Sequence, residues 1–510
     1  MEMAVPSMEN SAAAEISRQQ SPAAMPVLRA NADCPRKLSV AESRIERKEK
    51  GRTGILGVEG WLPFFCNLGW SGANQVTRAL LITFVVILVT RHLGPSAYGS
   101  LALGLSIVKI GIIGAGLGLG RILVQELVLE PESTSNIMKT GLLLKGLAGL
   151  LSYMGAILFV AIFLPNQEVV RLVVMIAGFA ILLQAFDTLD YRFQARGQMK
   201  LSFLGRTIPT VLASLLKVAA VMAGANLLTF ATLEAVEAVL ISAGLALVYW
   251  KTAGIKDFTI PSSPSASGRS PSTLLYDGLP LLISGVAVII YQRIDLIMLS
   301  MMIGGPSTGI YAAAAQVSEI WNVIPLALAP AVFPVILRAK ALSAEMFEHR
   351  FLAILQSMSL GAILIVCFVT VCASSIVNVL YGPAFANSAD ILRVHIWSIF
   401  FVFLGMTQTL WDAGEKLYWL TCFRTAAGAL CNVGLNLILI PEFGALGAAI
   451  ATLISYAVAA FLLNAATQKT MPLFTMQLKS LILIPLIGWL RHCRRCWKTD
   501  NEPNIATSRD

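Results

Sequence analysis

Long apolar segments recur along this chain, and they restrict its fold more than any other feature of the sequence. A helix needs about 20 apolar residues to cross the hydrocarbon of a bilayer, and twelve segments approach or exceed that length. Charged residues make up only 13% of the chain, against about 25% in soluble domains. We therefore predict an all-α polytopic membrane protein with about twelve transmembrane helices. The predicted spans are 68–90, 97–120, 139–164, 169–190, 203–224, 227–250, 279–303, 309–337, 351–380, 389–411, 417–440 and 443–466.

Basic residues are distributed unevenly between the two sides that these spans define. With the N-terminus inside, the inner connections and tails carry about twenty Lys and Arg residues, whereas the outer turns carry only Arg91 and Arg171. This asymmetry predicts that both termini are cytoplasmic. It also accounts for the net charge of +9 without a nucleic-acid partner.

A Ser/Pro-rich connection, "PSSPSASGRSPS", divides the spans six and six. The first span of each half ends in a similar turn, "RHLGPSAYG" and "MMIGGPSTGIY". We predict two six-helix lobes in the same orientation. The predicted regions are a disordered cytoplasmic tail at 1–60, an N-lobe at 61–250, a linker at 251–275, a C-lobe at 276–469, and an interfacial segment with a basic tail at 470–510. The short apolar piece 481–490 is interrupted by Pro485 and is not counted as a span.

Polar residues inside several spans mark the candidate site, because charged groups at this depth face protein or water rather than lipid. Arg78 and Asn74 lie on one stripe of the first span, and Gln292 and Asp295 share a face of the seventh, with Arg293 about 100° away. We predict a hydrated cavity between the halves. Its candidate lining residues are Arg78, Asn74, Lys109, Lys217, Gln292, Arg293, Asp295 and Gln316.

Cations outnumber the two central carboxylates considered, Asp295 and Glu319, so we expect a positive cavity suited to an anionic solute. The alternative is that Lys217, Arg293 and Asp295 make interhelical contacts that only fix packing. Glu319 has no basic residue within four positions on its own helix, which makes it the better candidate for a protonation switch. Asp295 is the second candidate for ion coupling, or a residue that bridges the lobes.

The sequence contains no pattern that predicts an enzyme, a metal site or a cofactor. The glycine-rich "GIIGAGLGLGR" (111–121) lies in an apolar helix without the strand that a dinucleotide site requires, and the four histidines are scattered. Cys493 and Cys496 form a CxxC pair without His partners, which is a weak signal.

Four stretches resemble Wzx-type polysaccharide flippases of the multidrug/oligosaccharidyl-lipid/polysaccharide exporter superfamily. They are "VTRHLGPSAYGSLALGLSIV", "YQRIDLIMLSMMIGGPSTGIYAAAAQVSEIWNVIPLALAPAVFPVI", "VLYGPAFANSADILRVHIWSIFFVFLG" and "CNVGLNLILIPEFGALGAAIATLISYAVAAF". The resemblance covers about residues 68–466. It implies a V-shaped, MATE-like architecture, with Arg78 in the place of a basic residue of the first span and Asp295 in that of an acidic residue of the seventh.

The resemblance also implies an activity. The chain would flip a polyprenyl-pyrophosphate-linked oligosaccharide across a bacterial inner membrane by alternating access, with H⁺ or Na⁺ as a counter-ion. Membrane lipids, a polysaccharide polymerase and the chain-length machinery are the implied partners.

Three other functions are considered. A drug or cation antiporter of the same superfamily would need cavity carboxylates, and the first span carries Arg78 instead. A lipid II flippase would need two further clear spans. A membrane glycan polymerase would need an ordered outer loop, and the outer connections here are short turns.

Overall fold

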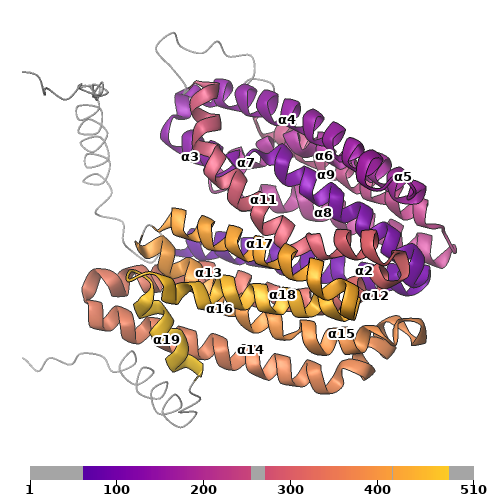
Figure 1. The fold of residues 1–510 in the computed structure, drawn as a ribbon. Coiled ribbons are helices and arrows are strands. Elements are labelled where there is room, and N and C mark those ends of the chain that lie inside the picture. The colour runs from indigo at the N-terminus through magenta and orange to yellow at the C-terminus, as the bar shows by residue number, and fades with distance from the viewer. Residues whose placement is uncertain (1–60, 254–269, 416, 482–510) are drawn as a thin grey trace, which may run out of the picture. The chain divides into compact units, whose positions relative to one another are not determined.

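The computed structural model describes residues 61–253, 270–415 and 417–481, and over these ranges the chain forms helices and turns with no strand (Figure 1). The chain divides after Cys66, and the fold below is that of the described residues from 67 onwards. The predicted tail 1–60, most of the linker, residues 482–510, and the side chains of 61–77 lie outside the description. The all-α class predicted from the sequence is confirmed.

The helices of the N-terminal half are α2 (Trp61–Gly116), α3 (Leu119–Leu129), α4 (Thr134–Phe163), α5 (Glu168–Ala177), α6 (Phe179–Leu183), α7 (Asp187–Ala195), α8 (Met199–Met222) and α9 (Leu227–Ala253). Those of the C-terminal half are α11 (Pro271–Met302), α12 (Gly305–Glu319), α13 (Val323–Leu342), α14 (Ala344–Tyr381), α15 (Ser388–His395), α16 (Trp397–Glu415), α17 (Tyr418–Phe443), α18 (Ala445–Ala460) and α19 (Met471–Leu481). Short 3-10 turns join several of them, including η4 (Gln184–Phe186), η5 (Ile320–Asn322) and η7 (Leu462–Ala466).

Ten helical stretches among the described residues are long and apolar enough to cross a membrane, judged by length and composition. One of them, 78–129, contains two predicted spans. The predicted span 309–337 corresponds to α12, η5 and α13 together. With these two adjustments the described helices match the twelve spans expected from the sequence.

The first two spans form one helix by hydrogen bonding, but Gly94 interrupts it. Gly94 has φ 73° and ψ 173°, a conformation that only glycine adopts readily, and Pro95 follows it. Residues before the break, such as Val89, and residues after it, such as Leu101, belong to the same hydrophobic cluster. The chain therefore turns back at Gly94, and α2 has two limbs, 67–93 and 95–116.

The span 309–337 is broken for a local reason. Pro325 has no N–H to donate to the carbonyl of Trp321, and its ring crowds that carbonyl. The chain accordingly passes through the 3-10 turn Ile320–Asn322 between α12 and α13. This break places Glu319, at the end of α12, where the helix stops.

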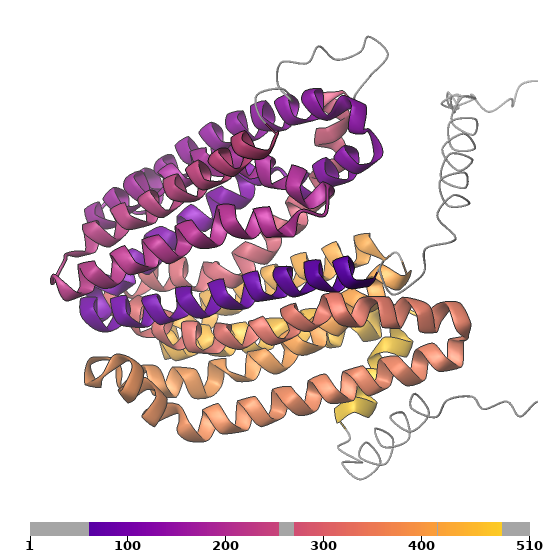
Figure 2. The same ribbon diagram turned by 180° about the vertical axis from the view of Figure 1, so that it is seen from behind.

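Two six-helix lobes are present, and each hydrophobic cluster lies mainly in one lobe, although Tyr98 of α2 belongs to the C-lobe cluster and Ile297 of α11 to an N-lobe cluster. The N-lobe comprises α2–α9 and the C-lobe α11–α18, with α19 packed against α14 and α16. Between the lobes, α11 contacts α3, and it also lies along α17 of its own lobe (Figure 1). The first limb of α2 runs beside C-lobe helices (indigo in Figure 2), where Val86 and Ile87 pack against the C-lobe core.

The two Gly-Pro turns singled out in the sequence meet in a main-chain contact, here called the glycine seam (Pro95, Gly99, Gly305 and Gly309). A Cβ added to Gly99 would lie 2.1 Å from the Gly305 carbonyl oxygen, and one added to Gly309 would lie 1.9 Å from the Pro95 oxygen. Only glycine permits this approach. The turns that begin each half thus join the lobes at the end of the molecule where α11 meets α12.

Candidate functional site

A cavity of about 340 Å³ lies between the lobes. Both limbs of α2, with α5, α6, α8 and α9, form its N-lobe walls, and α11 and α12 form the C-lobe side. Four of the sequence-predicted residues line it: Lys109, Lys217, Arg293 and Gln316. Cavities that bind small molecules commonly enclose about 300–1,000 Å³, so this one is large enough to hold part of a ligand.

Lys109 is the group in this cavity whose charge is not neutralised by a direct contact. It extends from the second limb of α2, with its side chain open to the cavity. Within the part of the chain that the structure describes, its ammonium makes no hydrogen bond and no ion pair, although it lies in the field of Arg293, Glu319 and Glu234. An ammonium has three donors and no acceptor, so Lys109 is available to an anion.

Arg78 does not line this cavity. It lies on the first limb of α2, in the field of Arg206, Glu237, Asp187 and Asp190. Its buried Nε has no hydrogen-bond partner, and no ion pair engages its guanidinium among the described residues. The side chain of Asn74, on the same predicted stripe, is outside the description.

Lys217 is held by two carboxylates that the sequence reasoning overlooked. Its Nζ lies 2.6 Å from Glu234 Oε1 and 2.7 Å from Glu237 Oε2, both on α9. All three side chains line the cavity, with Ser214 beside Lys217 on α8. The signal was present in the sequence, since two glutamates three residues apart in an apolar span lie on one helix face.

A second cluster of the same design lies on the same helix. Arg206 of α8 donates to Asp187 at 2.7 Å and to Asp190 at 2.9 Å, again two acids three residues apart. Arg206 and Lys217 are eleven residues apart, close to three helical turns, so both project from one face of α8. The Arg206 cluster does not contribute to the lining of the cavity.

Glu319 has no basic neighbour on its own helix, as the sequence shows, but a basic residue of another helix contacts it. Arg293 Nη2 lies 2.9 Å from Glu319 Oε2, joining α11 to the end of α12. Spacing along one helix shows only neighbours on that helix, and Arg293 reaches Glu319 from another. Arg293 and Asp295, two residues apart on α11, make different contacts.

Asp295 is buried within the C-lobe and is held by neutral donors from three helices. Tyr311 of α12 donates to Oδ2 at 2.7 Å, Thr452 of α18 donates to Oδ2 at 2.6 Å, and Asn436 of α17 donates to Oδ1. No basic side chain pairs with it among the described residues. Asp295 therefore ties C-lobe helices to one another, and the expectation that it bridges the lobes was wrong.

Beside Asp295 is a pocket of about 20 Å³, also lined by Gln292, Tyr311 and Glu319. One water molecule needs about 10–15 Å³ by this measure. The buried Oδ1 of Asn436 has no hydrogen-bond partner. The Asp295 carboxylate therefore accepts hydrogen bonds from two hydroxyl groups and lies beside a pocket that could hold about one water molecule.

The lining of the cavity contains three cations, Lys109, Lys217 and Arg293, against two carboxylates, Glu234 and Glu237. The excess of cations is therefore one charge. Lys217 is paired with both glutamates, and Arg293 is paired with Glu319 of the adjoining pocket. What distinguishes Lys109 is that no carboxylate contacts it.

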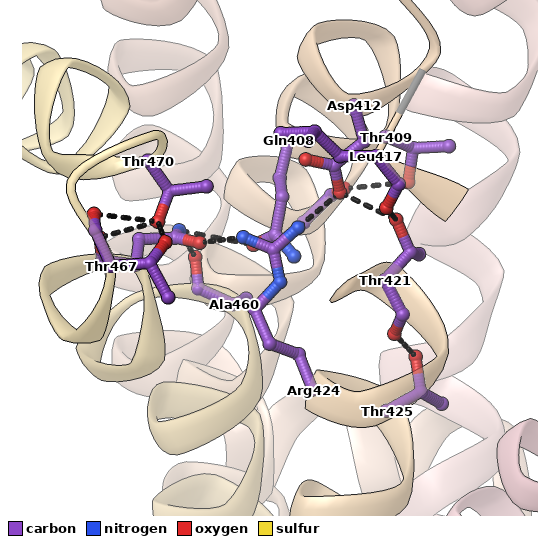
Figure 3. Close-up of polar contacts among 12 residues, drawn as sticks. Gln408, Thr409, Asp412, Leu417, Thr421, Arg424, Thr425, Ala460, Thr467 and Thr470 are labelled. Atoms are coloured by element: carbon purple, nitrogen blue, oxygen red, sulfur yellow. Dashed lines mark hydrogen bonds and ion pairs between the residues drawn. The ribbon is translucent and has the colours of Figure 1, made fainter. Parts of the chain in front are cut away.

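A third polar cluster lies in the C-lobe, away from the cavity (Figure 3). Arg424 of α17 pairs with Asp412 of α16 and donates to Asn464 of η7, and Arg424 and Asp412 are 1% and 2% exposed. Asn464 donates to Gln477 of α19 at 3.0 Å. This network joins α16, α17 and α19 through residues that are far apart in the sequence.

Comparison with known proteins gives consistent results. A family described as "Polysaccharide biosynthesis protein" matches residues 65–340. The chain is 25% identical over 407 residues to the "Probable flippase AglR" of Haloferax volcanii, an alignment that covers 78% of this chain and 82% of that protein.

Several solved structures share the fold. An inward-facing multidrug resistance MATE family transporter of the MOP superfamily has a TM-score of 0.61 and 17% identity, over 80% of this chain and 95% of that one. The lipid II flippase MurJ has a TM-score of 0.58 and 16% identity, over 81% and 91%. The eukaryotic MATE transporter AtDTX14 has a TM-score of 0.59 and 14% identity, over 82% and 100%. At these identities the likeness establishes a MATE-like fold.

Proposed function

Because this chain belongs to the polysaccharide biosynthesis protein family, we propose that it flips a polyprenyl-pyrophosphate-linked oligosaccharide from the cytoplasmic to the outer leaflet by alternating access. The resemblance to polysaccharide flippases of the exporter superfamily, expected from the sequence, is confirmed. The chain is a membrane transporter and not an enzyme, so the glycan polymerase considered above is set aside. What we propose is the identity of the cargo, a polyprenyl-pyrophosphate-linked oligosaccharide.

The observation that carries this proposal is Lys109. It is an exposed cation that lines the cavity between the lobes and has no ion-pair partner among the described residues. A phosphate group supplies the missing counter-charge and accepts charge-assisted hydrogen bonds from the ammonium. Arg78, also without an ion pair, offers a second cation on the other limb of α2.

A flipping assay in proteoliposomes tests the proposal. Purified protein is reconstituted with a labelled polyprenyl-diphosphate oligosaccharide, and the label exposed on each leaflet is measured over time. Lys109→Ala and Arg78→Ala should each slow flipping at least ten-fold, with partial recovery in Lys109→Arg and Arg78→Lys. Lys139→Ala, which removes an exposed lysine of α4 outside the cavity, should flip at the wild-type rate. Wild-type rates in both alanine variants would refute the anionic cargo.

The cation antiporter is the second candidate, and one observation favours it. Glu234 and Glu237 line the cavity, which supplies the carboxylates that the first span lacks. Lys217 already contacts both, so a cationic drug would have to compete with that ammonium. Drug resistance in cells that depends on Glu237 but not on Lys109 would support this candidate over the flippase.

Ion coupling is part of the same proposal, and Asp295 is the better placed of the two candidate carboxylates. Glu319 is paired with Arg293, whereas the hydrogen-bond partners of Asp295 among the described residues are all neutral. The pocket beside Asp295 has room for about one water molecule and is also lined by Arg293, Glu319 and His395. An H⁺ or a Na⁺ ion would neutralise Asp295 there. Glu319 would then respond to the cargo through Arg293.

The proposed setting is the inner membrane of a bacterium, with both termini in the cytoplasm. The uneven distribution of basic residues supports this orientation. Membrane lipids, a polysaccharide polymerase and the chain-length machinery would be the partners in that setting. The proposed division into tail, N-lobe, linker, C-lobe and terminal segment is based on the apolar spans and on the Ser/Pro-rich connection between the sixth and seventh spans.

A further inference from the structure

The wall of the cavity formed by α8 and α9 is polar along two matching stripes. On α8, Ser214 and Lys217 are three residues apart, and on α9 Glu234 and Glu237 are three residues apart. Residues at this spacing share a helix face, so the four polar side chains form one surface. The Glu234 side chain is 35% exposed and that of Glu237 is 14% exposed.

The ion pairs of Lys217 with Glu234 and Glu237 join α8 to α9, but a purely structural role does not explain why these side chains line the cavity. The Arg206 cluster makes the same kind of connection, from α8 to α7, with two acids at the same spacing and at similar distances. Its residues are not part of the cavity lining. The Lys217 cluster differs because its carboxylates line a space that also contains Lys109, a cation with no described partner.

We propose that Glu234 and Glu237, oriented by Lys217, bind hydroxyl groups of the glycan in the transported lipid, while Lys109 binds its phosphate. This inference rests on the proposed function. It assigns the two ends of the polar head group to two different helices, α9 for the sugar and α2 for the phosphate.

The chemistry of the carboxylates supports a sugar rather than a phosphate at this wall. Glu234 accepts from Lys217 through Oε1 and Glu237 through Oε2, and the second oxygen of each makes no other hydrogen bond within the described residues. An ionised carboxylate is an acceptor only, so its natural partner is a hydroxyl donor. Two carboxylates against one ammonium leave an excess negative charge, which repels a diphosphate and directs it towards Lys109.

Other charged groups face this wall and must be considered with it. On α2, Arg78 lies in the field of Glu237, and His92 contacts Phe230 of α9 near its beginning. Arg293 of α11 lines the same cavity but is paired with Glu319. The Arg206 cluster lies nearer the beginning of α8. Among the described residues, the cation that lines the cavity without an ion pair is therefore Lys109 of α2, and none is on α8.

Two probes separate the proposed subsites. One is a short-chain polyprenyl diphosphate without sugar, and the other is the same lipid diphosphate carrying a neutral trisaccharide. The affinity of the purified full-length protein for each is measured in detergent. Glu237→Gln should weaken binding of the sugar-bearing probe at least about ten-fold, the usual effect of losing a hydrogen bond to a charged group. Its affinity for the sugarless probe should be unchanged or higher.

Asp187→Asn is the matched control. Asp187 accepts from Arg206 at 2.7 Å and its side chain is 19% exposed, close to the 2.7 Å and 14% of Glu237. This variant should bind both probes as the wild type does. If Glu237→Gln fails to accumulate as a monodisperse protein, the same two measurements are made on Glu234→Gln. Glu234 is more exposed than Glu237, so its substitution should disturb the fold less.

The outcomes distinguish this inference from the function on which it rests. A glutamine variant that weakens both probes equally, or neither, overturns the glycan site while leaving the flippase proposal standing. A wild type that binds the sugarless probe as tightly as the sugar-bearing one overturns it as well. If the wild type binds neither probe, the proposed function fails and the glycan site falls with it.

Discussion

Replacing Arg424 by Leu should destabilise the C-lobe strongly. Arg424 and Asp412 are 1% and 2% exposed and form a direct ion pair, so the substitution leaves the Asp412 carboxylate buried without a counter-charge. Breaking a buried pair by removing one partner costs about 3–5 kcal/mol. The folding equilibrium should therefore shift by a factor between roughly 100 and 5,000. The measurement is the free energy of unfolding of purified protein in detergent, from denaturant titration.

A second substitution identifies the physical cause. Asp412→Leu combined with Arg424→Leu removes the unpaired charge, and apolar replacement of a whole buried pair is often neutral. The double variant should therefore regain at least half of the lost stability. As a control, Asp390→Asn breaks the exposed pair with Arg393, in which the side chains are 72% and 42% exposed, and should change stability by less than about 1 kcal/mol. A double variant no more stable than Arg424→Leu would refute this reasoning.

Three further predictions follow from other parts of the molecule. Gly99→Ala should lower stability by about 1–3 kcal/mol, because its Cβ would meet a facing carbonyl oxygen at 2.1 Å, whereas Gly155→Ala on the open face of α4 should not; equal melting temperatures would contradict this. Asp295→Asn mimics the protonated state, so flipping should lose its dependence on pH or Na⁺, and a wild-type pH profile in the variant would end the role proposed for Asp295. A cysteine replacing Ser307 should react with an impermeant reagent added to intact cells, and one replacing Ser267 should not, while the reverse labelling would invert the proposed topology.

The architecture could be predicted from the sequence because it depends on properties that are local along the chain. Twenty apolar residues specify a span wherever they occur, and Gly94 with Pro95 specifies a reversal. The matching turns of the two halves were also visible in the sequence, although their contact at Gly99 and Gly309 was not.

The candidate site was only partly predictable, because its contacts join residues far apart in the sequence. Lys109 and Lys217 were identified by their depth in a span, and both line the cavity. The partner of Glu319 is Arg293, 26 residues away on another helix, and no spacing rule reveals it. Glu234 and Glu237 could have been found, because both lie in the sixth predicted span. They were missed because only Asp295 and Glu319 were counted as carboxylates inside the spans.

The glycine seam has a consequence for how this protein responds to its surroundings. It joins the lobes through main-chain atoms of Pro95, Gly99, Gly305 and Gly309, and none of these carries an ionisable group. A contact between neutral main-chain groups neither titrates nor weakens as salt screens charges. Acidity and ionic strength therefore act on this molecule through its charged side chains, including those around the cavity, and not directly on the junction at the Gly-Pro turns.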